Sequence, residues 1–228
     1  MSILQTAPHG GRILTWSELV ATVAPKFFKP FAKATDQLEP IALLTPDPSG
    51  NVHIQGDLVL DCTTQNVVVE GNLIVDGNII MYVDEGFGTF LVVTGNVTAN
   101  AICLDGFPEL LVRGDVTCRN GIVGIHGDDG GYFEVQGRVH APILVADTYF
   151  NMVLNGPVEA ATVNTSYRQM KADYDLRNVH RALLSQFVIN NAGDADETDD
   201  DERDNSLNGE AVVAALKAGQ PVLRTPKA

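Results

Sequence analysis

Basic residues are scarce in this chain. Its 228 residues include 15 Lys and Arg against 29 Asp and Glu, which gives a formal net charge of −14. The shortage is sharpest between residues 41 and 167, where ten Asp and five Glu face only Arg113, Arg119 and Arg138. Nucleic-acid binding depends on Lys and Arg contacts to phosphates. The charge balance therefore argues against a nucleic-acid partner and favours a basic protein partner.

Cysteine is also scarce, and long apolar runs are absent. Cys62, Cys103 and Cys118 are odd in number and show no CxxC spacing, which favours a reducing compartment over a disulfide scaffold or a zinc site. No segment reaches the roughly 18 apolar residues of a membrane span. The N-terminus MSILQTAPHGGR lacks the apolar region of a signal peptide. We therefore expect a cytoplasmic protein without membrane association, metal or cofactor.

One short phrase, by contrast, recurs six times between residues 52 and 161. It consists of an apolar run, a Gly, usually an Asn or Asp, and a second apolar run. The average separation of its glycines is 20 residues, and a period of this length is typical of stacked-repeat proteins. The six copies are VHIQGDLVL, VVVEGNLIV, LVVTGNVTA, LLVRGDVTC, FEVQGRVHA and MVLNGPVEA, with Gly56, Gly71, Gly95, Gly114, Gly137 and Gly156.

Each unit supplies about three short β runs, rich in Val, Ile and Leu, separated by Gly-Asn, Gly-Asp or Asp-Gly turn signals. One unit cannot bury its own apolar side, whereas coils stacked about 4.8 Å apart give every backbone group a partner. The pattern predicts an all-β fold: a single-stranded, right-handed parallel β-helix (β-solenoid) of six coils over residues 41–165. A β-sandwich is the alternative, but it does not account for a 21-residue register.

The core of this β-helix is predicted from the repeat itself. Side chains that flank the repeated glycines at equivalent positions should stack in two columns. These side chains are Ile54, Leu58, Val69, Leu73, Val93, Val97, Val112, Val116, Val135, Val139, Leu154 and Val158.

Residues 1–40 are expected to form an N-terminal helical cap. Thr15 and Glu18 have the spacing of a capping box at a helix start. The aromatic segment from Phe27 to Phe31 is interleaved with lysines, and a membrane-surface anchor is the alternative interpretation. Pro25 and Pro30 break any continuous amphipathic helix here, so we favour a cap over the end of the solenoid.

Residues 166–228 are expected to be mainly helical. A run with helical spacing extends from Arg168 to Val188. An acidic segment follows between residues 194 and 204, with eight acids and one Arg, and such a composition predicts a loop. A last short helix is expected from Glu210 to Ala218, with Asn208 as its cap.

Acidic side chains recur at the end of the third β run of each unit. The spacing of 21 residues predicts that Asp84, Asp105, His126 and Asp147 stack as a ladder. A calcium site is one interpretation, and a row of solvated turn residues is another. The residues that we select as partner-binding candidates are Asp84, Glu85, Asp105, His126, Asp128, Asp129 and Asp147.

No catalytic residue is predicted. A glycosidase needs paired carboxylates across a cleft, and the ladder offers a row instead. His126 and His140 have no Ser or Cys arranged with them as a nucleophile. We therefore expect a protein that is not an enzyme.

The GNL, GNV and GDV phrases, with the LDG and IHG turns, resemble small bacterial β-helix proteins described as polymer-forming or bactofilin-like. They resemble more closely those encoded beside polymorphic toxins. The resemblance covers residues 50–161 and the closing AALKAGQPVLR. Similarity to the toxin-neighbouring group implies an immunity-type protein that binds and blocks a toxin. Similarity to bactofilins implies filaments formed by end-to-end stacking.

Three function classes follow in order of preference. The first is an acidic, immunity-type protein that neutralises a basic toxin. The second is a bactofilin-like structural polymer, although helical segments at both ends lead us to expect a monomer or a small closed oligomer. The third is a carbohydrate-active β-helix enzyme.

Overall fold

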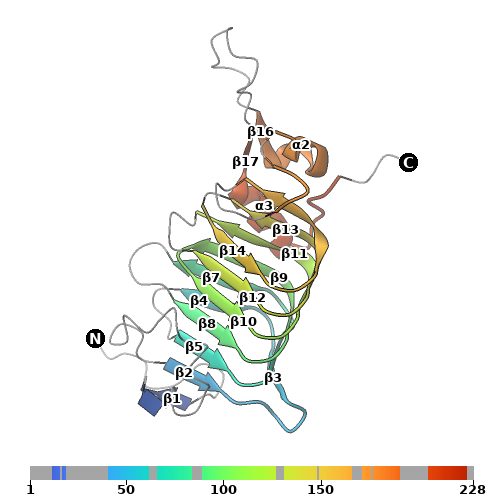
Figure 1. Ribbon diagram of the computed structural model, residues 1–228. Coiled ribbons are helices and arrows are strands. Elements are labelled where there is room, and N and C mark those ends of the chain that lie inside the picture. Colours follow the sequence, from blue (N-terminus) through green and yellow to red (C-terminus); the bar gives the residue numbers. More distant parts are fainter. Residues whose placement is uncertain are drawn as a thin grey trace.

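The chain forms a β-solenoid of about five stacked turns, with two short helices among the described residues (Figure 1). This architecture confirms the predicted parallel β-helix. The structure is a computed structural model, and it describes residues 12–15, 17–18, 41–61, 66–83, 89–126, 131–147, 149–165, 171–175, 177–190 and 205–224.

The stacked strands form six rungs, which the chain connects in about five turns, and the first two rungs contain three separate strands. Rung 1 has β2 (Ile41–Leu44), β3 (Asn51–Ile54) and β4 (Leu58–Asp61), and rung 2 has β5 (Asn66–Val69), β6 (Asn72–Val75) and β7 (Ile79–Val83). In rungs 3 to 6 the second and third strands join into one long strand. These rungs contain β8 (Phe90–Val93) and β9 (Val97–Gly106), β10 (Glu109–Val112) and β11 (Val116–Ile125), β12 (Tyr132–Val135) and β13 (Val139–Ala146), and β14 (Asn151–Leu154) and β15 (Val158–Asn164).

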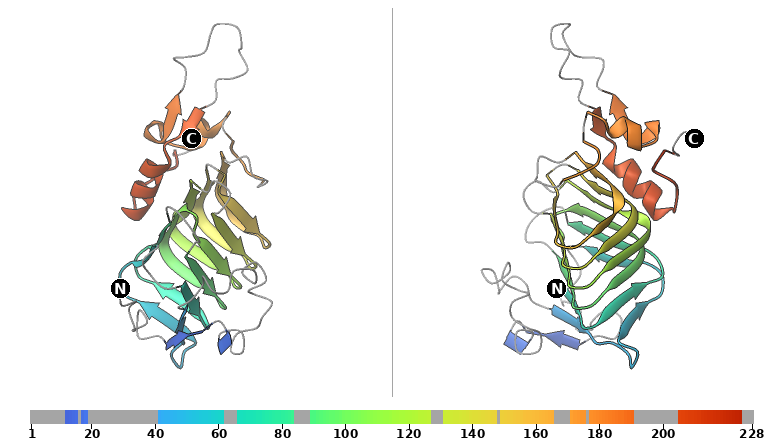
Figure 2. Two further views of the ribbon diagram at one scale, coloured as in Figure 1. Left: turned by 90° about the vertical axis from the view of Figure 1, so that its left-hand side faces the viewer. Right: turned by 45° about the vertical axis from the view of Figure 1, so that its right-hand side comes forward.

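Parallel pairing between rungs creates three faces. The first face consists of β2, β5, β8, β10, β12 and β14. The second face consists of β3, β6 and the first halves of the long strands, and the third face of β4, β7 and their second halves. The pairing register shifts between Cys118 and Gly121, where the long strand β11 passes from one face to the next. Figure 2 shows the stacked rungs from two further sides.

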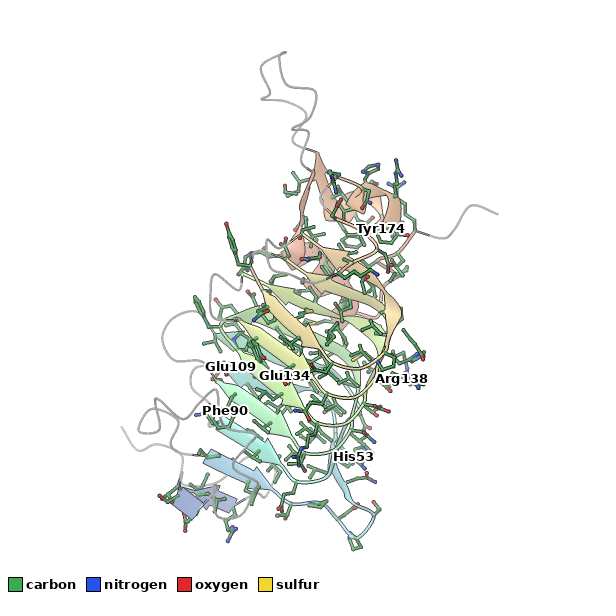
Figure 3. All side chains as sticks on the ribbon, viewed as in Figure 1. His53, Phe90, Glu109, Glu134, Arg138 and Tyr174 are labelled. Atoms are coloured by element: carbon green, nitrogen blue, oxygen red, sulfur yellow. The ribbon has the colours of Figure 1, made fainter. Side chains whose placement is uncertain are left out.

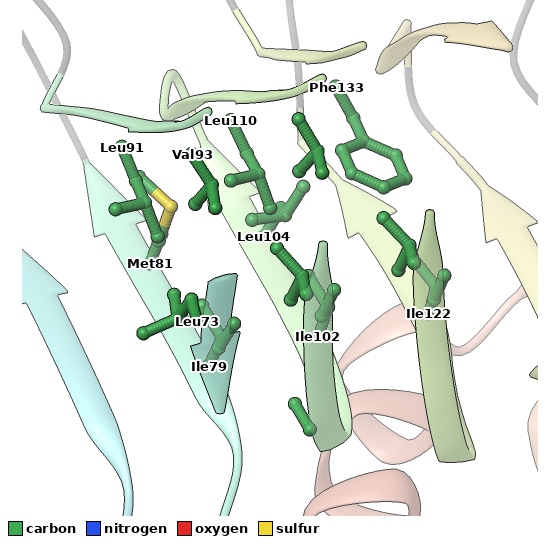
Figure 4. Close-up of a cluster of buried hydrophobic side chains, with 14 of the residues drawn as sticks. Leu73, Ile79, Met81, Leu91, Val93, Ile102, Leu104, Leu110, Ile122 and Phe133 are labelled. Atoms are coloured by element: carbon green, nitrogen blue, oxygen red, sulfur yellow. The ribbon is translucent and has the colours of Figure 1, made fainter. Parts of the chain in front are cut away.

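The interior is a continuous apolar column (Figure 4). Alternate side chains of each strand point inward, as the period of two requires. All the predicted core side chains are buried except two in rung 6: Leu154 is partly buried and Val158 is 36% exposed. Full burial of a Val or Leu side chain contributes about 1.5–3 kcal/mol. The prediction for Val158 is wrong, because among the described residues no strand pairs with the first half of β15 on its outer side and covers this side chain.

The repeated glycines lie where successive rungs approach most closely. A Cβ atom on Gly114 would lie 2.7 Å from the carbonyl oxygen of Gly95, so no side chain fits there.

Gly56 does not belong to this column, contrary to the predicted alignment. A Cβ atom on Gly77 would lie 2.7 Å from the Gly56 oxygen, and one on Gly71 would lie 2.6 Å from the Gly50 oxygen. Gly56 therefore stacks with Gly77 at a second corner of the solenoid. In the first column, the glycine of rung 1 is Gly50, which lies against Gly71.

The Asn or Asp that follows a repeated Gly links one rung to the next. The Asn96 N–H donates to Asn72 Oδ1 at 2.9 Å, and the Asp115 N–H donates to Asn96 Oδ1 at 2.8 Å. These bonds satisfy backbone donors at the turn, where the strand ladder is interrupted. The ladder is the physical reason for the recurring Gly-Asn and Gly-Asp pairs.

At the N-terminal end, strand β1 (Arg12–Leu14) pairs antiparallel with β2, which the sequence did not predict. The predicted capping box is confirmed: the Thr15 N–H donates to Glu18 Oε2 at 2.8 Å, and the Glu18 N–H donates to Thr15 Oγ1 at 3.3 Å. The aromatic segment from Phe27 to Phe31 lies outside the described residues.

The long helix predicted from Arg168 to Val188 is wrong. The described part contains helix α2 (Val179–Ala182), the 3₁₀ turn η4 (Ser185–Phe187) and strand β16 (Val188–Asn190), which pairs antiparallel with β17 (Asn205–Leu207). The acidic segment 194–204 lies outside the described residues.

Pairing with the C-terminal tail explains why that helix ends early. Leu183 and Leu184 have extended backbones, with ψ of 152° and 147°. Leu183 forms an antiparallel bridge with Leu223, and the Leu184 N–H donates to the Val222 oxygen at 3.0 Å. These long-range hydrogen bonds override the local helical pattern.

The last predicted helix is confirmed as α3 (Gly209–Lys217). The Asn208 side chain caps it and accepts from the Ala211 N–H at 3.2 Å. Gly219 follows the helix with φ of +68°, a conformation that Gly adopts without a steric penalty.

Candidate functional site

Asp105 and His126, two of the four residues predicted to stack at 21-residue intervals, do not share one register. Asp105 pairs with Tyr82 of rung 2 and with Ile125 of rung 4. The paired residues are thus 23 and 20 positions apart in the sequence, and not 21. His126 thus lies one position beyond the Asp105 column. Loops of different length change the interval from rung to rung, and strand pairing decides which side chains stack.

Asp105 and His126 nevertheless meet. His126 directly follows β11 and has a left-handed backbone, with φ of 53°. Its Nδ1 lies 2.9 Å from Asp105 Oδ1 in the rung below, and both side chains reach the surface. A surface pair of this kind contributes only about 0–1 kcal/mol to stability. The pair therefore matters more as a surface feature than as a stabilising contact.

Asp147 is placed differently. Its Oδ1 accepts a hydrogen bond from the Thr165 hydroxyl of rung 6. Its other carboxylate oxygen lies beside the start of α3, where a Cβ atom on Gly209 would be 3.4 Å away. A carboxylate at a helix N-terminus is stabilised by the helix dipole. Asp147 thus joins the solenoid to the C-terminal segment.

The other four candidates, Asp84, Glu85, Asp128 and Asp129, lie outside the described residues. A role in partner binding stays a prediction for all seven. Within the described ranges, no group of three or more His, Cys, Asp or Glu side chains is arranged to hold a metal ion.

The second face presents an open row of side chains, one from each rung. Strand pairing aligns them from rung 1 to rung 6. All are exposed except Ile74, which is half-buried. The row consists of His53, Ile74, Thr98, Thr117, His140 and Glu159.

Charged pairs also cross rungs on this face. His53 Nε2 lies 2.7 Å from Asp76 Oδ1. Glu159 lies 3.3 Å from Arg138 and 3.1 Å from His140 Nδ1. Figure 3 shows His53 and Arg138 on the same side of the solenoid. The second face therefore presents charges of both signs.

The outside of the first face contains an acidic group that sequence analysis missed. Burial raises the pKa of Glu109 to about 7. Glu109 lies between Phe90 and Tyr132 in the strand register (Figure 3). The Tyr132 hydroxyl donates to Glu134 Oε2 at 2.7 Å. The pKa of Tyr132 is raised mainly by burial and to a smaller extent by this hydrogen bond. The sequence did contain a signal for these partly buried acids, because Glu109 and Glu134 each lie within an otherwise apolar run, PELLV and YFEV.

The outside of the third face is apolar and largely covered. Ala101, Cys103, Val123 and other outward side chains of rungs 3 to 6 form a second core with the C-terminal segment. From that segment, Val212 and Leu216 of α3 pack against this core together with Phe187, Leu207 and Val222.

A groove of about 280 Å³ lies beside this second core. Arg119, Asn120, Pro142 and Ile143 line its solenoid side, and residues 219–223 of the tail line the other. The Asn120 amide donates to the Leu216 oxygen at 3.0 Å, so it already serves to hold the end of α3.

Comparison with known proteins gives no match: no protein-family profile, curated protein or solved structure is similar to this chain. Among the residues that the structure describes, no helix is long and apolar enough to cross a membrane. The function must therefore be inferred from the geometry.

Proposed function

We propose that this chain is a non-catalytic β-solenoid that binds another protein. The observation that supports this proposal is the open second face, with one outward side chain per rung from His53 to Glu159 held in register by parallel strands. Such a surface is rigid before a partner arrives, so little conformational entropy is lost on binding. An exposed sheet face suits a folded protein better than a small molecule, which requires a concave site.

The negative charge of the solenoid indicates the charge of the partner protein. Residues 41–167 have fifteen acids and three Arg, and a field of one sign speeds association with a molecule of the opposite sign. The exposed Asp105–His126 pair lies at the end of the third face, and the candidate acids Asp128 and Asp129 follow His126 closely in sequence. The partner is therefore a basic protein.

The specific form of the proposal is an immunity-type protein that neutralises a basic bacterial toxin in the cytoplasm. The resemblance of residues 50–161 to β-helix proteins encoded beside toxins supports this role. In such a role, a rigid acidic surface that binds quickly is an advantage, because the toxin must be captured before it acts.

Co-expression with the protein encoded by the adjacent gene tests the proposal. We expect the two proteins to copurify as a complex, and expression of this chain to relieve any growth defect caused by the neighbour. Replacing Thr98 and Thr117 by Arg should weaken the complex by at least about tenfold, because the new side chains obstruct the face and add like charge. The matched control, Ser185→Arg with Gln186→Arg, adds the same two charges at exposed residues of η4, outside the solenoid. A neighbour that neither binds nor is neutralised would refute the toxin-neutralising role.

Self-association is a second candidate function, and the open end of rung 6 favours it. Val158 is 36% exposed, and among the described residues no strand pairs with the outer edge of β14. Unpaired strand edges are templates for another chain. At the other end, β1 pairs with β2, and Ile54, Leu58 and Leu60 are buried. One open end predicts a closed pair, and filaments in the electron microscope would contradict this prediction.

A further inference from the structure

Burial of the outward side chains of the third face ends between rung 3 and rung 2, although the end of α3 reaches the Asn78 corner of rung 2. Helix α3 packs on β9 and β11, and the outward side chains of these strands are buried beneath the C-terminal segment. The outward side chains of β4 and β7 are not buried: Val59 is 51% exposed, Tyr82 is 44% exposed and Ile80 is half-buried. The right-hand view of Figure 2 shows α3 beside the upper rungs only.

The uncovered surface continues the rows that α3 covers. Val59 pairs with Ile80, which pairs with Cys103 beneath the C-terminal segment. In the second row, Asp61 pairs with Tyr82, and Tyr82 pairs with Asp105. We call the five residues Val59, Asp61, Ile80, Tyr82 and Asp105 the shelf. Val59 and Ile80 form its apolar half. Tyr82 forms the other half, between the carboxylates of Asp61 and Asp105.

The way in which α3 is held shows what this surface can accept. The end of α3 is fixed at the corner of the solenoid, where the Asn78 amide donates to the Lys217 oxygen at 3.3 Å and the Asn120 amide donates to the Leu216 oxygen at 3.0 Å. Its start lies against Ile125 near the other end of the strands. The helix therefore runs along the strands of the third face.

The dimensions of the shelf suit a second helix beside α3. Two rungs span roughly 10 Å at the strand spacing of about 4.8 Å. Packed helices lie about 8–10 Å apart. The exposed outward side chains of rungs 1 and 2 thus leave room for one more helix beside α3, which packs mainly on β9 and β11 of rungs 3 and 4 and reaches Asn78 of rung 2 with its last turn.

We propose that the shelf binds an amphipathic, basic helix of the partner protein, parallel or antiparallel to α3. Apolar side chains of that helix cover Val59 and Ile80 and extend the second core. Its Lys or Arg side chains pair with Asp61 and Asp105, and a cation over the Tyr82 ring adds a cation–π contact. This inference rests on the proposed role in protein binding and adds to the second face a further contact surface, on the third face, with the partner element that it accepts.

A synthetic probe tests the shelf without the natural partner. The probe is a fluorescein-labelled 18-residue helical peptide with Leu at helical spacing on one face and Lys along both margins. A scrambled peptide of the same composition is its control. Fluorescence anisotropy with the full-length chain measures binding, and the salt dependence reports the contribution of the carboxylates.

Matched variants separate the shelf from general surface effects. The double variant Val59→Ser and Tyr82→Ser removes exposed apolar groups from the shelf. The control, Tyr149→Ser and Ile189→Ser, removes similar side chains that are 41% and 46% exposed elsewhere. We expect the shelf variant to bind the probe at least about tenfold more weakly, and the control to bind it as the unmodified chain does. Circular dichroism checks that both variants fold.

Three outcomes would overturn the inference: no binding of the helical probe, equal binding of the scrambled probe, or equal binding by the shelf variant. The complex with the neighbouring protein gives an independent test. If that complex forms equally well with the shelf variant, the shelf is not the binding surface, although the proposed function stands. If no such complex forms while the probe binds only the intact shelf, the toxin-neutralising role fails and the shelf stands.

Discussion

Asp115 Oδ1 accepts a hydrogen bond from the Arg138 N–H of the next rung at 2.7 Å. This contact is the last link of the ladder through Asn72 and Asn96. Arg138 has no side-chain acceptor to continue it, and the next residue in the column, Pro157, has no N–H to donate. The chain thus ends the ladder without leaving a turn donor unpaired.

The ladder predicts the effect of shortening one of its members. Asn72→Ala removes the acceptor for the Asn96 N–H and the donor to Asn51 Oδ1. We expect a loss of about 1 kcal/mol in the free energy of unfolding, measured by urea titration. The control, Thr98→Ala, changes an exposed side chain and should alter stability by less than about 0.5 kcal/mol. Equal effects would show that the ladder is dispensable.

Glu109 predicts an unusual dependence of stability on pH. Its pKa is about 7 in the folded chain against an ordinary value of 4.5, so the folded state binds the proton more tightly. Stability is therefore highest below the ordinary pKa and is lost as the pH rises through 7. We expect Glu109→Gln to be more stable than the unmodified chain at pH 8, by about 2 kcal/mol, and this advantage to vanish near pH 4.

The measurement is the urea midpoint of both proteins across that pH range. Glu159→Gln, which alters an exposed carboxylate, is the control and should show no such trend. A stability difference between Glu109→Gln and the unmodified chain that is the same at pH 4 and pH 8 would contradict the prediction.

The two described cysteines should be unreactive in the folded chain. Burial raises the pKa of Cys103 to about 12 and also raises that of Cys118, and the thiolate is the form that reacts. With Cys62 replaced by Ser, we expect no labelling by a thiol reagent such as DTNB until urea unfolds the protein. Rapid labelling of Cys118 without denaturant would show that the solenoid core opens.

Undocking α3 should expose one thiol and not the other. Cys103 lies in the second core with Leu216, whereas Cys118 lies inside the solenoid. In the Cys62→Ser background, Leu216→Asp places a charge in the second core, which is unfavourable without a partner. We expect about one thiol per chain to react. The neighbouring exposed change, Lys217→Asp, should leave both protected, and labelling of both thiols in Leu216→Asp would mean that the solenoid depends on α3.

Val158 provides a test of pairing through rung 6. Val158→Lys places a charge on the open edge, a substitution that opposes edge-to-edge association. If the chain forms pairs, we expect the molar mass from light scattering to fall to that of a monomer. Ile189→Lys, on an exposed residue of β16, should leave the pair intact. A pair that survives Val158→Lys would place the contact elsewhere.

The sequence alone determined the repetitive part of the fold. Alternating apolar residues around Gly-Asn and Gly-Asp turns have a period of two within each run and about 20 residues between runs, and few folds satisfy both periods. The ends of α3 were also predictable, because Asn208 and Gly219 act on their immediate neighbours. Local chemistry therefore sufficed for the solenoid, its core and its last helix.

Only the tertiary structure decided which side chains stack, which faces are covered and where helices stop. Asp105 aligns with Tyr82 because loops differ in length between rungs, and Leu183 is extended because a tail residue forty positions later pairs with it. The shelf has the same physical origin: Val59 and Tyr82 follow the same outward alternation as Cys103, yet α3 covers only the later rungs. Contacts between distant segments determine these features, and no local pattern encodes them.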